Sequence, residues 1–139
     1  MHTRTHDARP LVLFLEDERA LQRLVSSALS AEGFRVQSAL DGEDGLRLIR
    51  NSRPDAILLD LILPKRDGFS VLAELKEERL LADIPAIVLT NLESSADMRR
   101  AYALGAVTYL VKANYTLSEI VEKVKGCLRQ KWETEKESD

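Results

Sequence analysis

The sequence of 139 residues has one cysteine, no long apolar run and only a small excess of charge of one sign. The lone Cys127 excludes an internal disulfide, and we expect it to pack as a small apolar side chain. No spacing of cysteine and histidine is typical of a zinc site. The apolar run 11–15 is far too short to cross a membrane. We therefore expect a cytoplasmic protein with no membrane contact.

The net charge is −3, from 20 basic and 23 acidic residues, so no basic field is available to hold a phosphate backbone. We expect no direct binding of nucleic acid. Length and composition, with 45% hydrophobic and 31% charged residues, fit one globular domain. We place that domain at residues 10–130, after a loose N-terminal leader (1–9) and before a charged C-terminal tail (131–139) that frays from the last helix.

Short apolar runs alternate with stretches whose apolar residues recur every three or four positions, which is typical of repeated βα units. The expected strands are 11–15, 34–38, 56–59, 86–89 and 107–111. Right-handed crossovers then give an α/β fold of the flavodoxin-like kind: a doubly wound, five-stranded parallel sheet of order 2-1-3-4-5 with five helices. We expect two helices on one face and three on the other. The fourth helix, 96–104, is only weakly amphipathic and should be the least firmly docked.

Polar residues stand where the predicted strands end, and they are Glu16, Asp17, Asp60, Thr90 and Lys112. Carboxyl ends of parallel strands share one edge, and ligands bind there where the strand order reverses. Two carboxylates about 4 Å apart repel by about 4 kcal/mol at an effective dielectric constant near 20, so three of them require a cation. Oxygen ligands without sulfur or imidazole favour Mg²⁺. The sequence therefore predicts a magnesium site at this edge.

A cation at this edge would neutralise the oxygens of an incoming phosphoryl group and leave Asp60 as the nucleophile. The Thr90 hydroxyl and the Lys112 ammonium suit contacts with phosphoryl oxygens. Each residue also has an ordinary interpretation: acids at a helix start, a turn, a strand-end hydroxyl, a solvated lysine. Their coincidence on one edge of the sheet favours the functional interpretation.

Five stretches of the chain, in order, resemble the receiver domain of two-component response regulators, the family that includes the bacterial chemotaxis regulator. The resemblance covers roughly residues 10–130. The stretches that carry it are Leu13-Phe-Leu-Glu-Asp-Glu18, Pro54-Asp-Ala-Ile-Leu-Leu-Asp60, Leu63-Pro-Lys-Arg-Asp-Gly68, Ile84-Pro-Ala-Ile-Val-Leu-Thr90 and Gly105-Ala-Val-Thr-Tyr-Leu-Val-Lys112.

This resemblance implies specific roles for the residues at the strand ends. Asp60 would be the phosphoacceptor. Glu16 and Asp17 would hold Mg²⁺ together with Asp60 and the main-chain carbonyl of Ile62, and Lys112 would contact the phosphoryl group. The phosphoryl group would come from a sensor histidine kinase or a histidine phosphotransfer protein.

The resemblance also implies a switch formed by Thr90 and Tyr109. The phosphoryl oxygen would draw the Thr90 hydroxyl inward, the Tyr109 ring would turn into the vacated space, and the surface of the fourth helix, fifth strand and fifth helix would change. An ordinary half-exposed aromatic on an edge strand is the alternative for Tyr109.

Two residues depart from the usual family pattern. Ala113 follows Lys112 where the family usually has a proline in a cis peptide, and a cis bond before alanine costs about 3–4 kcal/mol, so we predict a trans bond and an altered loop. Asn91 stands where related receivers carry a smaller residue, and we hypothesise that it alters the lifetime of the phosphoryl group.

The predicted function is a stand-alone receiver, a signalling domain and not a turnover enzyme, that acts on an unidentified protein target. Few residues follow the predicted last helix, so we expect no DNA-binding or output domain within this chain. A receiver-like binding module without phosphorylation is the main alternative. A phosphohydrolase of the haloacid-dehalogenase type would want an aspartate in place of Ile62, and a flavin carrier would want a phosphate-binding loop in place of the acids 16–18.

Overall fold

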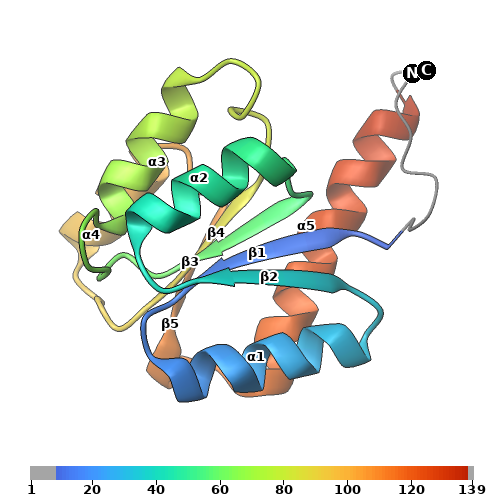
Figure 1. Cartoon of the computed structure of the whole chain (residues 1–139), viewed down its shortest axis with the longest axis horizontal. Helices are drawn as coiled ribbons and strands as arrows, with labels where there is room; N and C mark the ends of the chain where they lie inside the picture. The colour runs from blue at the N-terminus through green and yellow to red at the C-terminus, as the bar shows by residue number, and fades with distance from the viewer. Residues whose placement is uncertain (1–8, 138–139) are drawn as a thin grey trace.

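The fold is described from a computed structural model, which covers the backbone of residues 9–137 and the side chains of residues 9–130. Strands and helices alternate along the whole of it (Figure 1). The strands are β1 (Leu11–Leu15), β2 (Arg35–Ala39), β3 (Ala56–Leu59), β4 (Ala86–Thr90) and β5 (Thr108–Val111). The helices are α1 (Arg19–Ala31), α2 (Gly42–Ser52), α3 (Gly68–Glu77), α4 (Ser95–Ala103) and α5 (Leu117–Glu137), with a short 3₁₀ helix, η1 (Lys112–Asn114), before α5.

The five strands form one parallel sheet of order β2-β1-β3-β4-β5, as the sequence predicts. Helices α2, α3 and α4 cover one face, and α1 and α5 cover the other (Figure 1). The central strands β1, β3 and β4 are buried along their whole length, because a parallel sheet covered on both faces has no solvated side.

Each face of the sheet has its own hydrophobic core, and alternate residues of one strand supply the two cores. Leu13 and Leu15 of β1 pack under α2, α3 and α4, whereas Val12 and Phe14 pack under α1 and α5. This follows from the two-residue period of a strand, whose successive side chains point to opposite faces. The unbroken apolar run in the sequence therefore serves two cores at once.

Side-chain caps fix where α2, α3 and α4 begin. Asp41 accepts a hydrogen bond from the Asp44 N–H at the start of α2, at 2.8 Å, and Asp67 caps α3 in the same way. Ser94 accepts from the Asp97 N–H at the start of α4. Such caps satisfy N–H groups that have no partner within the helix. They also set the ends of the loops that surround the carboxyl edge of the sheet.

The boundaries differ from the predicted ones mainly at the ends of the chain. Helix α5 continues to Glu137, so residues 131–137 of the predicted tail are helical, and the predicted division of the chain at residue 130 stays a prediction. The predicted leader, apart from Arg9, lies outside the described residues. The weak docking expected of α4 agrees with its burial, since Ala101 is its one buried residue. Within the described part of the chain, no helix has both the length and the apolarity needed to cross a membrane.

Candidate functional site

Three acidic side chains, which directly follow β1 and β3, meet at the carboxyl edge of the sheet. Because β1 and β3 are neighbours, with Leu15 opposite Leu59, the residues that follow them leave the sheet side by side. One carboxylate oxygen from each of Glu16, Asp17 and Asp60 lies within 4.8 Å of the others. Glu16 and Asp60 are buried and Asp17 is exposed, so the acidic cluster opens to solvent on one side.

Lys112, which follows β5, reaches into the acidic cluster. Its Nζ lies 2.8 Å from Asp60 Oδ2 and 2.9 Å from Glu16 Oε1. Burial raises the pKa of Glu16, although Lys112 opposes the shift. Burial alone would lower the pKa of Lys112, but its hydrogen bond to Asp60 and its ion pair with Glu16 outweigh burial and raise the pKa. One ammonium against three carboxylates leaves the cluster net negative.

The acidic cluster fits a divalent cation. Glu16 Oε1 is buried and, among the described residues, receives no hydrogen bond of adequate angle, even though Lys112 forms an ion pair with it. The other oxygen, Oε2, accepts the Glu18 N–H at 3.0 Å. A buried carboxylate oxygen with spare lone pairs, in a set that contains only oxygen ligands, suits a hard cation such as Mg²⁺, Mn²⁺ or Ca²⁺.

The loop after β3 fixes the Asp60 carboxylate. Asp60 Oδ1 accepts the Ile62 N–H at 3.1 Å, so each of its two oxygens has a donor. Gly68 closes the loop, and its N–H donates to the Leu61 carbonyl. A Cβ at Gly68 would lie 2.5 Å from the Asp60 carbonyl oxygen and 2.6 Å from Leu61 Cα, so only glycine fits without a shift. The Ile62 side chain is exposed, and the role of its carbonyl as a metal ligand stays a prediction.

Thr90 and Tyr109 are joined through a single residue of the β4–α4 loop. Thr90 is fully buried, and its hydroxyl accepts the Leu92 N–H at 3.4 Å. The Tyr109 hydroxyl donates to the Leu92 carbonyl at 2.7 Å. Tyr109 is only 8% exposed, so the interpretation as a half-exposed edge aromatic is wrong. Burial raises the pKa of the Tyr109 hydroxyl.

The two departures from the family pattern lie at the surface. Asn91 and Ala113 are both exposed. The described residues contain no cis peptide bond, so the Lys112–Ala113 bond is trans, as predicted. Lys112 reaches both carboxylates from this backbone. Any effect of Asn91 on the lifetime of a phosphoryl group stays a prediction.

Sequence reasoning missed Gln22 of α1. Its Nε2 donates to the main-chain carbonyls of Glu16, at 3.0 Å, and Ala39, at 3.2 Å. These bonds tie together the ends of β1 and β2 next to the acidic cluster. No sequence signal identifies Gln22, because its partners are backbone groups and a glutamine on a helix is usually solvated.

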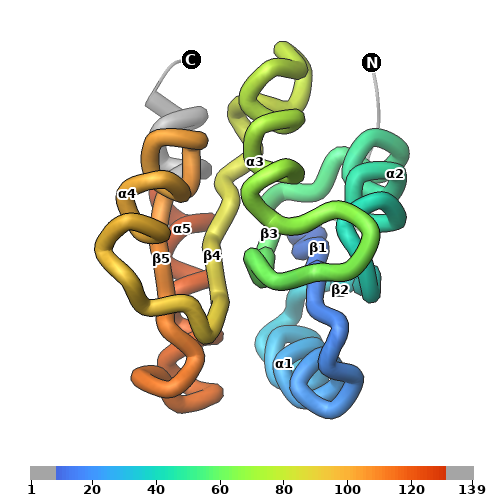
Figure 2. Tube along the Cα trace, turned by 90° about the vertical axis from the view of Figure 1, so that its left-hand side faces the viewer, coloured from blue at the N-terminus to red at the C-terminus, as the bar shows by residue number. Residues whose placement is uncertain are grey.

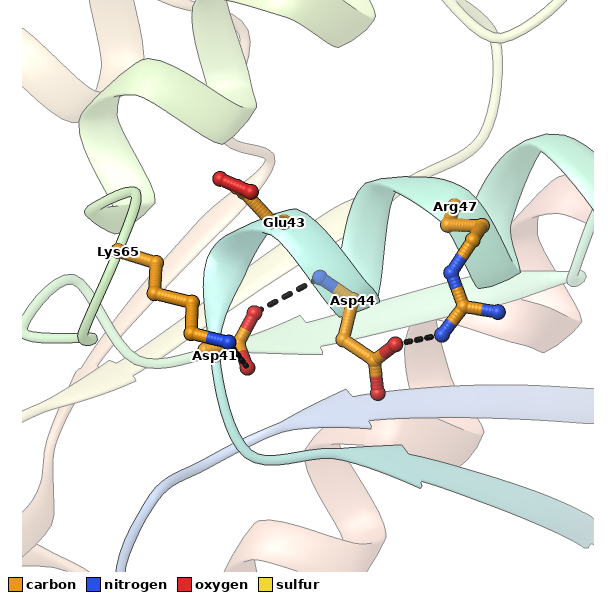
Figure 3. A pocket seen from close by; sticks show the side chains of 5 residues that line it. All are labelled: Asp41, Glu43, Asp44, Arg47 and Lys65. Atoms are coloured by element: carbon orange, nitrogen blue, oxygen red, sulfur yellow. Dashed lines mark hydrogen bonds and ion pairs between the residues drawn. The ribbon is translucent and has the colours of Figure 1, made fainter.

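A polar hollow of about 470 Å³ lies beside the loop that follows Asp60, and it is separate from the acidic cluster. Asp41, Glu43, Asp44, Arg47 and Lys65 line it (Figure 3). Lys65 from the β3–α3 loop points toward Asp41, with 3.7 Å between Nζ and Oδ2, and Arg47 pairs with Asp44. These charges largely neutralise one another, and none of the three clustered acids lines the hollow.

Comparison with known proteins identifies the family of the chain. The family model described as the response regulator receiver domain matches residues 12–125. The DNA-binding dual master transcriptional regulator RpaA of Synechocystis sp. is 39% identical over 121 residues, which cover 87% of this chain and 50% of that protein. Response regulator MprA of Mycobacterium sp. (strain KMS) is 34% identical over 119 residues, 86% of this chain and 50% of that protein. The chain thus spans about half the length of these curated relatives.

Solved structures agree with the sequence relatives. The phosphorylated cyanobacterial phytochrome response regulator RcpA is 36% identical, with a TM-score of 0.76 over 86% of this chain and 91% of that one. The Mn²⁺-bound form of response regulator Rcp1 is 33% identical, with a TM-score of 0.74 over 84% of this chain and 90% of that one. The match of the family model, the identity to these relatives and the shared fold show that the chain belongs to the family of response regulator receiver domains.

Proposed function

We propose that this chain is a phosphoacceptor signalling domain in which Asp60 takes a phosphoryl group in the presence of Mg²⁺. One observation carries the proposal: Lys112 Nζ bridges Asp60 and Glu16 at 2.8 and 2.9 Å, and an oxygen of Asp17 lies within 4.8 Å of these carboxylates. A nucleophilic carboxylate, further carboxylates for a cation and a basic group for phosphoryl oxygens are the groups that phosphoryl transfer to aspartate requires.

The reaction transfers the phosphoryl group from a phosphohistidine to Asp60. A carboxylate oxygen of Asp60 forms the new bond to phosphorus as the bond from phosphorus to the histidine nitrogen breaks. The Ile62 N–H and Lys112 hold the carboxylate in one orientation before the transfer. The transfer moves negative charge from the Asp60 carboxylate onto the phosphoryl oxygens. Lys112, which pairs with this carboxylate before the transfer, would then pair with a phosphoryl oxygen.

Glu16, Asp17, Asp60 and the main-chain carbonyl of Ile62 would hold Mg²⁺. The bound ion supplies positive charge that neutralises the phosphoryl oxygens. The buried Glu16 oxygen that lacks a well-oriented hydrogen bond supports this assignment, as does the open side of the cluster at Asp17.

Leu92 connects phosphorylation to the surface. Its N–H binds the Thr90 hydroxyl and its carbonyl binds the Tyr109 hydroxyl. A phosphoryl oxygen that accepts a hydrogen bond from Thr90 would reorient that hydroxyl, and Leu92 would pass the change to the Tyr109 ring. The surface formed by α4, β5 and α5 would then change, because Tyr109 packs in the core between the sheet and α4.

The partners follow from this chemistry. We propose a sensor histidine kinase or a histidine phosphotransfer protein as the source of the phosphoryl group, and a protein as the target, in a cytoplasmic pathway. The DNA-binding activity named for RpaA is that of a protein about twice as long. The net charge of −3 gives this chain no field that would hold a nucleic-acid backbone.

The test is incubation with Mg²⁺ and acetyl phosphate, followed by intact-mass measurement. We expect one added phosphoryl group on the wild type and none on Asp60→Asn. Asp55→Asn is the matched control, because Asp55 is also buried but lies at the opposite end of β3, where its carboxylate accepts the Leu11 N–H. Label on Asp60→Asn, or no label on the wild type, would contradict the proposal. Rapid turnover of phosphate esters would favour a phosphohydrolase instead.

A further inference from the structure

Tyr109 has an aromatic partner in addition to the Leu92 carbonyl, which binds its hydroxyl. Tyr102 of α4 lies against it, with 6.4 Å between the ring centroids and an angle of 42° between the ring planes. The centroid distance falls within the range in which aromatic pairs attract each other. Tyr102 is 49% exposed and Tyr109 is 8% exposed, so the pair runs from the surface of α4 into the core.

Helix α4 buries few of its residues, and the ring pair is one of the contacts that join it to β5. Ala101 is the one residue of α4 that is fully buried. On the side of α3, the Arg100 guanidinium lies 4.1 Å from the centre of the Phe69 ring, and Lys76 Nζ donates to the Ala103 carbonyl at 2.9 Å. Helix α4 runs beside β5, the strand that carries Tyr109 (Figure 2).

We propose that Tyr102 is a positioning residue that holds Tyr109 in the inward orientation seen in the structure. The Leu92 carbonyl binds the hydroxyl end of Tyr109, and the Tyr102 ring binds its aromatic body, so loss of either contact weakens the inward orientation. The inference rests on the proposed role of Tyr109 as the mobile ring, and it adds a residue that sets how far the equilibrium favours the inward orientation.

The proposed role of Tyr102 depends on its aromatic ring and not on its hydroxyl. The ring contact is the interaction that joins Tyr102 to Tyr109, so Tyr102→Phe should preserve the inward orientation. Tyr102→Ala removes the ring and should lower the ratio of inward to outward Tyr109 by about two- to tenfold, the range expected for loss of one aromatic pair. If Tyr102 only stabilised α4, the ratio of inward to outward Tyr109 would be the same in Tyr102→Phe and Tyr102→Ala.

The test uses the full chain labelled with 3-fluorotyrosine and ¹⁹F NMR, without any phosphodonor. Three tyrosines give three resonances, and Tyr109→Phe identifies the resonance of Tyr109. We expect that resonance to stay near its wild-type position in Tyr102→Phe and to move toward that of a solvent-exposed tyrosine in Tyr102→Ala. Tyr115 belongs to a different part of the fold and should not move, which makes it the internal control.

An unchanged Tyr109 resonance in Tyr102→Ala would overturn the inference, as would equal displacement in the phenylalanine and alanine variants. If Tyr102→Ala does not fold, Tyr102→Leu keeps apolar bulk without a ring and provides the same comparison. Because this measurement needs no phosphorylation, its failure is distinct from a failure of the mass measurement on Asp60. If the wild type takes up a phosphoryl group on Asp60 but the Tyr109 resonance is unchanged in Tyr102→Ala, only the positioning role of Tyr102 is refuted.

Discussion

Lys112→Met removes a cation that lies against two buried carboxylates, and the two distances set the size of the energetic cost. At 2.8 Å from Asp60 Oδ2, with an effective dielectric constant near 20, the attraction is about 6 kcal/mol, and the contact with Glu16 at 2.9 Å is similar. Burial of the three groups offsets most of this attraction, because each buried ion loses several kcal/mol of hydration. Removing one partner of a buried ion pair typically costs about 3–5 kcal/mol.

We therefore expect Lys112→Met to lower the free energy of unfolding by about 3–5 kcal/mol at neutral pH in EDTA. The loss should shrink at acid pH. Lys112 lowers the pKa of Glu16 in the wild type, so the variant has a higher pKa there and its folded state holds the proton to higher pH. The stability of the variant then falls relative to the wild type as the pH rises through the Glu16 pKa values of the two proteins. Below these values the stabilities of the two proteins converge.

Urea unfolding at several pH values, with EDTA or with excess Mg²⁺, measures this effect. Excess Mg²⁺ should narrow the gap, because the bound cation restores positive charge beside the same carboxylates. Lys125→Met is the matched control, because Lys125 pairs with Glu32 at 2.8 Å on the surface. This variant should lose little free energy of unfolding, and Mg²⁺ should not change that loss. A deficit in Lys112→Met that is the same at acid and neutral pH, and with or without Mg²⁺, would refute the reasoning.

Three further predictions concern the loops and the ring around the cluster. Gly68→Ala pushes a Cβ into backbone atoms beside Asp60, so it should cost about 1–3 kcal/mol and slow labelling by acetyl phosphate, whereas Gly126→Ala, which meets no atom within 4 Å, should leave labelling unchanged. Equal labelling rates would contradict this. Tyr109 should ionise above the ordinary tyrosine pKa in an absorbance titration, because burial raises its pKa. Its contribution to stability is complete below the ordinary tyrosine pKa and is lost as pH rises beyond it. A late component that persists in Tyr109→Phe would exclude this assignment. Asn91→Ala should change the rate at which the phosphoryl group is lost from Asp60, measured by intact mass after removal of the donor, and an unchanged rate would leave Asn91 without that role.

The fold could be predicted from the sequence because central parallel strands, which are buried on both faces, consist almost entirely of apolar residues. The strands β1, β3 and β4 are apolar along their length, and amphipathic stretches between them mark the helices. The acidic cluster could be predicted for a related reason. Residues that follow neighbouring parallel strands must emerge at one edge, so Glu16, Asp17 and Asp60 are brought together once the strand order is known.

What the sequence alone determined was the sheet and the position of the reactive groups along it, because both depend on residue type and period. Only the tertiary structure decided that Lys112 bridges two carboxylates, that Leu92 joins Thr90 to Tyr109, and that Tyr102 lies against the Tyr109 ring. These contacts use backbone groups, or side chains from different elements of the fold. Their distances depend on how loops and helices pack, and no pattern of residue types records that.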